Sequence, residues 1–186
     1  MEKDEKTRAF ICIDFPDEVI KEIARIQSLI LNKKFTGKIT ELENLHLTLK
    51  FLGEIDKETL EKTKQALSTL KFKEFEAKLL YPGAFSYRNS PRIIWLKLGG
   101  KNIFELQKQI DESLKQFFKP EERFMSHLTL ARIKYVKDKK DFVDYIKNIS
   151  TKQITFKISS FKLKSSELKP LSPVYTTLKE YKLNDI

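Results

Sequence analysis

The stretch Leu45–Leu49 reads LHLTL, and the stretch Ser126–Leu130 reads SHLTL. The string His-Leu-Thr-Leu therefore occurs twice, and its two copies contain both histidines of the chain. Apolar and polar residues alternate in each copy, which is the pattern of a half-buried β-strand. Side chains of a strand point alternately to its two faces, so the leucines should face the core and the histidine and threonine should share the opposite face. The repeat predicts two strands that each present an imidazole beside a hydroxyl.

The sequence around these two strands predicts further strands and helices. Apolar residues at helical spacing predict one helix opened by Pro16, one capped by Asp56, one capped by Asn102 and ending near Phe117, and a short one over 141–149. Turn residues at Gly53, Pro82-Gly83 and 89–91 should end strands. The expected strands cover 8–14, 45–52, 75–80, 92–98, 127–133, 154–163 and 174–183.

The order of these elements indicates a duplicated architecture. Each half of the chain has a strand, a long helix and then a strand carrying the repeated motif, and no linker rich in Ser, Gly or Pro separates the halves. We therefore expect an α+β protein, a single domain over residues 1–186, built from two pseudo-symmetric lobes. Their sheets should share a cleft lined by both histidines and both threonines.

Composition limits the class of protein. Of the 186 residues, 40% are apolar and 33% are charged, which is typical of a soluble globular chain. The net charge of +10 favours polyanionic partners such as nucleic acid, although a lysine-rich chain also arises from genome bias or adaptation to heat. The sequence shows neither a membrane span nor a signal peptide, and the N-terminus is a charged run. Cys12, the single cysteine, should be a buried inert thiol, so we expect a cytoplasmic protein.

The duplicated His and Thr pairs suit phosphoryl chemistry without a metal. Imidazole titrates near neutral pH, so one ring can accept a proton while its twin donates one. Threonine hydroxyls can donate hydrogen bonds to phosphate oxygens, where transition-state charge accumulates. A lone histidine on a half-buried strand is usually structural, but two matching copies are hard to explain in that way. A zinc site fits poorly, because two histidines without nearby cysteines match no common ligand spacing.

The motifs resemble those of the 2H phosphoesterase superfamily, and within it the RNA 2′,3′-cyclic phosphodiesterases, also called 2′–5′ RNA ligase-like or LigT-like proteins. The similarity covers nearly the whole chain. Ser126 stands where proline is usual before the second histidine, and Ser172-Pro173 stands where Gly-Pro is frequent. The matching stretches are RAFI at 8–11, ENLHLTLKFLGE at 43–54, PRIIWL at 91–96, SHLTLAR at 126–132 and the tail around Pro170 and Tyr175.

The resemblance implies two lobes whose antiparallel sheets form a V-shaped cleft with helices outside. It also implies metal-independent hydrolysis of a terminal 2′,3′-cyclic phosphate on RNA to a 2′-phosphate, without a cofactor, as a step of RNA processing. By motif position, His46 and His127 would be catalytic, and Thr48, Thr129 and Arg132 would bind the substrate phosphate. Simple alternation puts Arg132 on the face away from His127, so a bulge or the strand end must turn it into the cleft.

Some assignments stay open at this stage. We expect His127 to act as the base and His46 as the acid, although pseudo-symmetry makes the opposite order almost as good. Lys50 falls on the His46 face if its strand is regular. Phe85, Tyr87, Phe124 or Tyr175 could stack a terminal base, whereas Trp95 reads as structural.

Three other functions compete with this one. The first is a 2H phosphoesterase that acts on a small cyclic nucleotide, and the second is 2′–5′ ligation of RNA ends. The third is a non-catalytic RNA-binding protein, whose binding would survive loss of both histidines and fall steeply with salt. A monomer is expected, because one chain already holds both half-sites.

Overall fold

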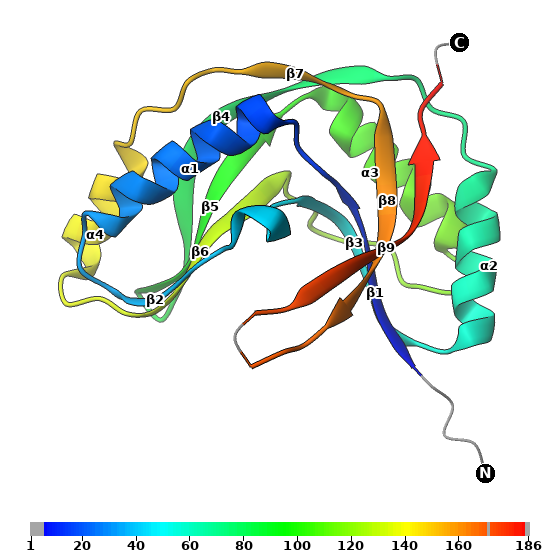
Figure 1. The fold of residues 1–186 in the computed structure, drawn as a ribbon, viewed down its shortest axis with the longest axis horizontal. Helices are drawn as coiled ribbons and strands as arrows, with labels where there is room; N and C mark the ends of the chain where they lie inside the picture. The colour runs from blue at the N-terminus through cyan, green and yellow to red at the C-terminus, as the bar shows by residue number, and fades with distance from the viewer. Residues whose placement is uncertain (1–5, 171, 185–186) are drawn as a thin grey trace.

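The computed structural model describes residues 6–170 and 172–184, which fold into two antiparallel sheets with helices against them (Figure 1). Most of the charged N-terminal run lies outside the described residues. The first sheet has the order β3-β1-β8-β9, and the second has the order β2-β6-β5-β4-β7. The strands of the first sheet are β1 (Thr7–Ile13), β3 (Leu47–Ile55), β8 (Ser160–Glu167) and β9 (Val174–Lys182). Those of the second are β2 (Thr36–Ile39), β4 (Phe75–Tyr87), β5 (Ser90–Gly99), β6 (His127–Tyr135) and β7 (Thr155–Ile158).

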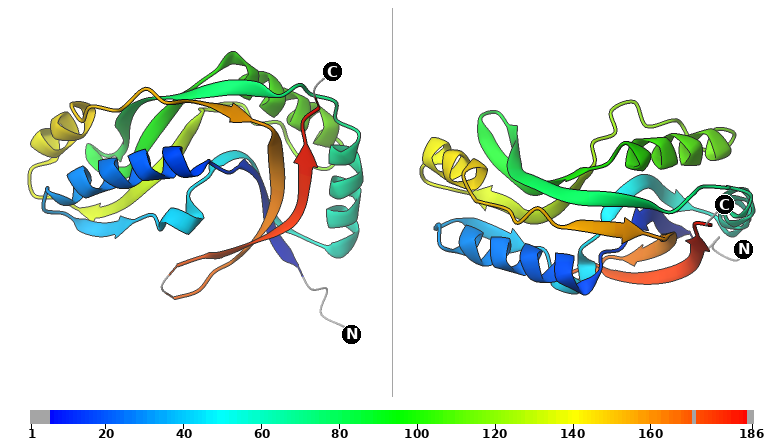
Figure 2. Two further views of the ribbon diagram at one scale, coloured as in Figure 1. Left: turned by 45° about the horizontal axis from the view of Figure 1, so that its top comes forward. Right: turned by 90° about the horizontal axis from the view of Figure 1, so that it is seen from above.

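The helices pack in two pairs at opposite ends of the molecule (Figure 2). Helices α1 (Asp17–Leu31) and α4 (Lys139–Lys147) lie against the second sheet, and α2 (Lys57–Ser68) and α3 (Lys101–Leu114) lie against the first. Helix α1 therefore packs on β6, the strand of the second motif, whereas α3 packs on β3, the strand of the first. The expected α+β fold with two pseudo-symmetric lobes is confirmed.

The core forms where the sheets meet their helices. The four leucines that follow the two histidines, Leu47, Leu49, Leu128 and Leu130, are at most 1% exposed. Their burial confirms the face assignment made from the alternating pattern. Cys12 is also fully buried, and burial raises the pKa of its thiol to about 12, as expected for an inert cysteine.

Two predicted turns are strand irregularities instead. Gly53 does not end its strand, because β3 continues to Ile55 and Gly53 takes a positive φ of 75° at a shift in register with β1. Pro82-Gly83 likewise lies inside β4, beside a register shift, and the hairpin turn comes later. Arg88 and Asn89 make that turn with φ values of 47° and 58°, as a two-residue hairpin loop requires.

Other boundaries also differ from the prediction. Asp56 caps α2 as expected, accepting a hydrogen bond of 2.7 Å from the Thr59 amide. Asn102 does not cap α3, because Gly100 occupies the cap position and the helix already ends at Leu114. The single strand expected over 154–163 is divided into β7 and β8, which belong to different sheets, and β2 was not expected at all. No helix among the described residues is long and apolar enough to span a membrane.

Candidate active site

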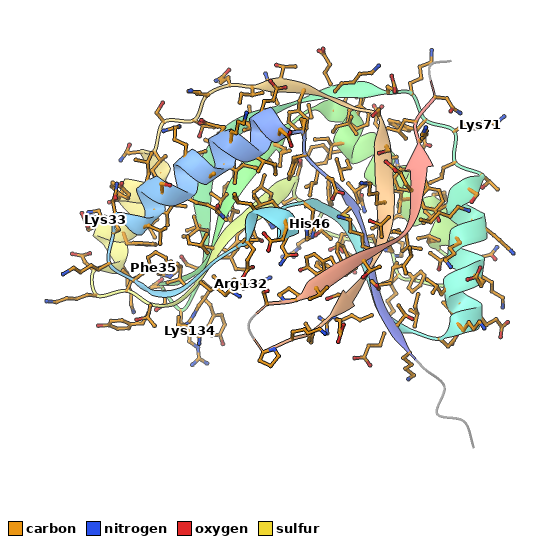
Figure 3. The ribbon with its side chains drawn as sticks, viewed as in Figure 1. Lys33, Phe35, His46, Lys71, Arg132 and Lys134 are labelled. Atoms are coloured by element: carbon orange, nitrogen blue, oxygen red, sulfur yellow. The ribbon has the colours of Figure 1, made fainter. Side chains whose placement is uncertain are left out.

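The two repeated motifs meet across a V-shaped cleft of about 400 Å³ between the sheets. His46 immediately precedes β3, and His127 is the first residue of β6. All five residues singled out from the sequence line this cleft. The lining consists of Lys38, Ile39, Thr40, Glu41, Asn44, His46, Thr48, Phe51, Ile93, His127, Thr129, Arg132, Pro173 and Tyr175. Figure 3 shows His46 near the middle of the molecule and Arg132 on the β6 side of it.

Both imidazole rings are held in the same way. Nδ1 of His46 lies 2.8 Å from the Asn44 carbonyl oxygen, and Nδ1 of His127 lies 2.7 Å from the Met125 carbonyl oxygen. In each motif the partner is the residue two positions before the histidine. A carbonyl oxygen only accepts hydrogen bonds, so Nδ1 carries the proton in both rings. The neutral rings therefore keep Nε2 as the unprotonated nitrogen available for proton exchange.

His46 and Thr48 form a direct pair. Nε2 of His46 lies 3.0 Å from the Thr48 hydroxyl oxygen, which donates when the ring is neutral. Burial, with a smaller effect from the positive charge of Lys164, lowers the pKa of His46 to about 4. Burial also lowers the pKa of His127, and nearby Lys97 acts in the same direction. Both rings are thus neutral at pH 7 in the free protein, and a bound phosphate anion would favour their protonation.

A β-bulge interrupts each motif at the same point, three residues after the histidine. On β3, Thr48 pairs with Cys12 and Lys50 with Ile11, so Leu49 is the extra residue. On β6, Thr129 pairs with Trp95 and Ala131 with Ile94, so Leu130 is the extra residue. A bulge reverses which face the following residues take. The pseudo-symmetry of the lobes therefore extends to an irregularity of the backbone.

The bulge on β6 accounts for the direction of Arg132. Leu130 and Ala131 are both buried, and Arg132 then returns to the cleft face, as the expected bulge required. Buried Gln27 of α1 holds this bulge, because its side-chain amide donates to the carbonyl oxygens of Thr40 at 2.8 Å and Leu130 at 3.1 Å. The guanidinium of Arg132 takes part in none of the ion pairs found among the described residues, which leaves it free to bind an anion.

The bulge on β3 makes the expectation for Lys50 wrong. Lys50 points away from His46 into the interior, where its side chain is 3% exposed and pairs with the Asp111 carboxylate of α3. Its ammonium also donates to the Lys119 carbonyl oxygen at 2.7 Å. Phe51, which sequence reasoning missed, takes the cleft position that corresponds to Arg132 on β6. Regular alternation assigns Lys50 and Phe51 to the wrong faces of β3, and only the register shift at Leu49 gives the correct faces.

Aromatic side chains enclose both histidines. The rings of Phe10 and Tyr175 lie 4.8 Å and 5.3 Å from the His46 ring, centroid to centroid, and the Phe85 ring lies 5.1 Å from that of His127. Tyr175 and Phe85, two of the four residues considered for stacking a base, therefore lie beside the histidines. Phe124 packs on Phe104 instead. The described residues contain no cluster of three or more His, Cys, Asp or Glu side chains that could hold a metal ion.

Comparison with known proteins gives consistent similarities. The family model described as LigT like Phosphoesterase matches residues 13–95 and 98–175. The RNA 2′,3′-cyclic phosphodiesterase of Methanocaldococcus jannaschii is 37% identical, covering 94% of this chain and 99% of the relative. The protein of the same name from Methanothermobacter thermautotrophicus is 30% identical, covering 96% and 100%. A crystal structure of a protein from Thermus thermophilus superposes with a TM-score of 0.81 at 26% identity, covering 95% of this chain and 97% of that one.

Proposed function

This chain belongs to the LigT-like phosphoesterase family, and on that premise we propose that it hydrolyses the terminal 2′,3′-cyclic phosphate of RNA to a 2′-phosphate. As a member of this family it is a phosphodiesterase, a hydrolase. The observation that most supports the specific chemistry is the matched pair of histidines in one cleft, each with Nδ1 bonded to a backbone carbonyl. Such a pair offers two equivalent Nε2 atoms for acid–base work, and the proposal requires no metal.

The proposed reaction moves two protons and exchanges one bond. Nε2 of His127 takes a proton from water as the water oxygen forms a bond to phosphorus. The bond between phosphorus and the ribose 3′-oxygen breaks, and Nε2 of His46 donates a proton to that oxygen. The products are a 2′-phosphate and a 3′-hydroxyl. This order requires His46 to be protonated at the start, and a bound phosphate anion opposes the lowering of its pKa.

Thr48, Thr129 and Arg132 are proposed to hold the phosphate during this step. When His46 is protonated its Nε2 becomes a donor, so the Thr48 hydroxyl is released from the ring and can donate to a non-bridging oxygen. Thr129 occupies the equivalent position on β6. The planar guanidinium of Arg132 can donate two parallel hydrogen bonds to the same group.

We also propose that the chain acts as a monomer and a single domain over 1–186, because both half-sites come from one polypeptide. A buried single cysteine has no need of an oxidising compartment, which supports a cytoplasmic location.

A substrate with sulfur in place of the 3′-oxygen tests the proton assignments. A thiolate leaves without prior protonation, so the variant that lacks the acid should recover most of its rate on this substrate. With RNA ending in a normal 2′,3′-cyclic phosphate, His46→Ala and His127→Ala should both be slow, and the product of the wild-type protein should be a 2′-phosphate. With the 3′-sulfur analogue, only His46→Ala should recover. Recovery of His127→Ala alone would reverse the roles, and a 3′-phosphate product would contradict the proposed bond cleavage.

A further inference from the structure

Three aromatic side chains form a continuous strip next to His127 on the cleft face of the second sheet. We define the aromatic strip as Tyr81 and Phe85 of β4 with Trp95 of β5. Trp95 lies directly opposite Thr129 on β6, so the two side chains share the cleft face. The ring centroid of Trp95 lies 6.3 Å from that of Tyr81 and 5.4 Å from that of Phe85, which in turn lies 5.1 Å from His127.

The residue opposite Trp95 on β4 makes room for its ring. Gly83 pairs with Trp95, and a β-carbon added at Gly83 would lie 2.4 Å from carbons of the indole ring. The indole therefore lies directly over the β4 backbone, between Tyr81 and Phe85. Pro82-Gly83, which the sequence suggested as a turn, is instead the part of the strand that accommodates this ring.

The aromatic strip is accessible to solvent. Tyr81 is 56% exposed and Phe85 is 36% exposed, while Trp95 is half-buried between them. Proteins that bind single-stranded nucleic acid often use an exposed row of aromatic rings, because any of the bases can stack on such a ring. The aromatic strip has this arrangement and lies beside the proposed site for an RNA end. The aromatic strip therefore indicates a binding role for Trp95 in addition to the structural role expected from the sequence.

A lysine lies beside the aromatic strip, directly opposite His127 in the sheet. Lys97 pairs with His127 across β5 and β6 and stands two residues after Trp95, so it shares the cleft face. Its ammonium lies 5.6 Å from the centre of the Phe104 ring, and it takes part in none of the ion pairs found among the described residues. A partly buried cation without a carboxylate partner suits a phosphate group.

We propose that the aromatic strip and Lys97 form a second nucleotide subsite, which holds the nucleotide immediately 5′ of the one that carries the cyclic phosphate. This inference rests on the proposed function. The cyclic phosphate lies between the histidines, and the terminal nucleoside fills the cleft between Arg132 and Tyr175. The chain then continues across His127, where its phosphodiester contacts the Lys97 ammonium and the preceding base stacks on Tyr81 and Trp95. The enzyme is thus built for an RNA strand rather than for a mononucleotide.

Paired changes in protein and substrate test this subsite. The substrates are cytidine 2′,3′-cyclic phosphate, a dinucleotide ending in the same group, and that dinucleotide with an abasic 5′ residue. Wild type should have the highest kcat/KM on the complete dinucleotide. Tyr81→Ala should lower that kcat/KM about fivefold or more while leaving the mononucleotide and the abasic dinucleotide almost unchanged. Tyr81→Phe, which keeps the ring, should behave as wild type.

The matched control is Tyr135→Ala, which removes a tyrosine of similar exposure, 63%, from the C-terminal end of β6, outside both the aromatic strip and the cleft lining. It should leave all three rates unchanged. For Lys97, the second substrate is a dinucleotide whose linking phosphodiester is replaced by an uncharged methylphosphonate. This replacement should lower the kcat/KM of wild type by the same factor by which Lys97→Gln lowers kcat/KM on the normal dinucleotide. Lys97→Gln assayed on the methylphosphonate should show no further decrease in kcat/KM.

Three results would overturn the subsite. The first is equal use of mononucleotide and dinucleotide by wild type, and the second is an equal loss on both substrates in Tyr81→Ala. The third is additive losses in the Lys97 pair. Inactivity of wild type on every cyclic phosphate would instead refute the proposed function itself, so the two failures can be told apart.

Discussion

Thr48 is the side chain that contacts the reactive nitrogen of His46, since its hydroxyl oxygen lies 3.0 Å from Nε2. We predict that Thr48→Val, which keeps the shape and removes the hydroxyl, lowers kcat about 100-fold because a donor to the phosphate is lost. Thr48→Ser keeps the donor and should retain most of the rate. Steady-state kinetics on an RNA 2′,3′-cyclic phosphate measures both variants. A Val variant within about twofold of wild type would exclude this role, since loss of a transition-state donor costs far more.

The buried imidazole of His46 should also make the fold sensitive to acid. Burial lowers its pKa from 6.5 to about 4 in the folded protein. Between these pH values the unfolded chain binds a proton that the folded chain does not, so the free energy of unfolding decreases as pH falls through this range. The pKa of His127 is also lowered by burial, so His127 contributes to the pH dependence with the same sign. The free energy of unfolding should therefore be largest above pH 6.5 and decrease as the pH falls towards 4.

Urea unfolding of wild type and His46→Gln at a series of pH values between about 8 and 4 measures this effect. The wild-type midpoint should fall more steeply below pH 6.5 than the midpoint of His46→Gln, because glutamine does not titrate. The difference between the two proteins removes the contribution of the carboxylates, which both share. Parallel curves would show that His46 titrates alike in the folded and unfolded states.

At this scale duplication and alternation in the sequence marked the two histidines and the two threonines directly. Arg132 was predicted from the family resemblance alone, because simple alternation places it on the opposite face. It could not predict the backbone carbonyls of Asn44 and Met125, since any residue supplies a carbonyl and only the local path of the chain aims it at Nδ1. Phe51 was not predicted to line the cleft for a similar reason, because its position there depends on the bulge at Leu49.

Strand β3 and helix α3 are joined by a buried ion pair between Lys50 and Asp111, whose side chains are 3% and 9% exposed. The carboxylate also accepts hydrogen bonds from the Gln107 side chain at 2.7 Å and from the Glu121 amide at 2.8 Å. Lys119 and Glu121, which contact this pair, belong to the segment between α3 and His127. The ion pair thus connects β3, which carries the first motif, to α3 and to the segment that precedes the second motif.

We predict that Lys50→Met lowers the free energy of unfolding by about 3–5 kcal/mol, because it leaves the Asp111 carboxylate buried without a counter-charge. The double variant Lys50→Met/Asp111→Leu should be more stable than Lys50→Met, since it removes the isolated charge. Urea unfolding at neutral pH gives both values. A loss below about 1 kcal/mol in Lys50→Met would match an exposed pair and would contradict the buried arrangement.

Elements with strong local signals were predicted well, and those determined by pairing were not. Helices α1 and α2 follow from apolar spacing and from the cap at Asp56. Strand β2, with sequence TGKI, has almost no apolar content and exists because it pairs with β6. The division at Ser159 between β7 and β8 also depends on which sheet each segment joins, and a continuous run of strand-forming residues gives no sign of it.

On the scale of the whole molecule, duplication of the sequence corresponds to two sheets that face one cleft. The chain does not place each half in its own sheet, because β8 and β9 from the end of the chain complete the sheet that begins with β1 and β3. The hairpin β8–β9 lies beside β1 in this sheet (Figure 1). Its Tyr175 lines the cleft next to His46. Sequence order alone does not reveal this exchange, which is why the shared cleft could be predicted but its full lining could not.

The central claim is that two histidines from one chain open a cyclic phosphate without a metal. The most direct measurement is hydrolysis of a short RNA ending in a 2′,3′-cyclic phosphate, in excess chelator, with wild type, His46→Ala and His127→Ala assayed side by side. Wild type should convert the end to a 2′-phosphate, and each variant should lose about 100-fold or more of the rate while keeping its folded far-UV spectrum. No conversion by wild type in chelator, or equal conversion by either variant, would contradict the account.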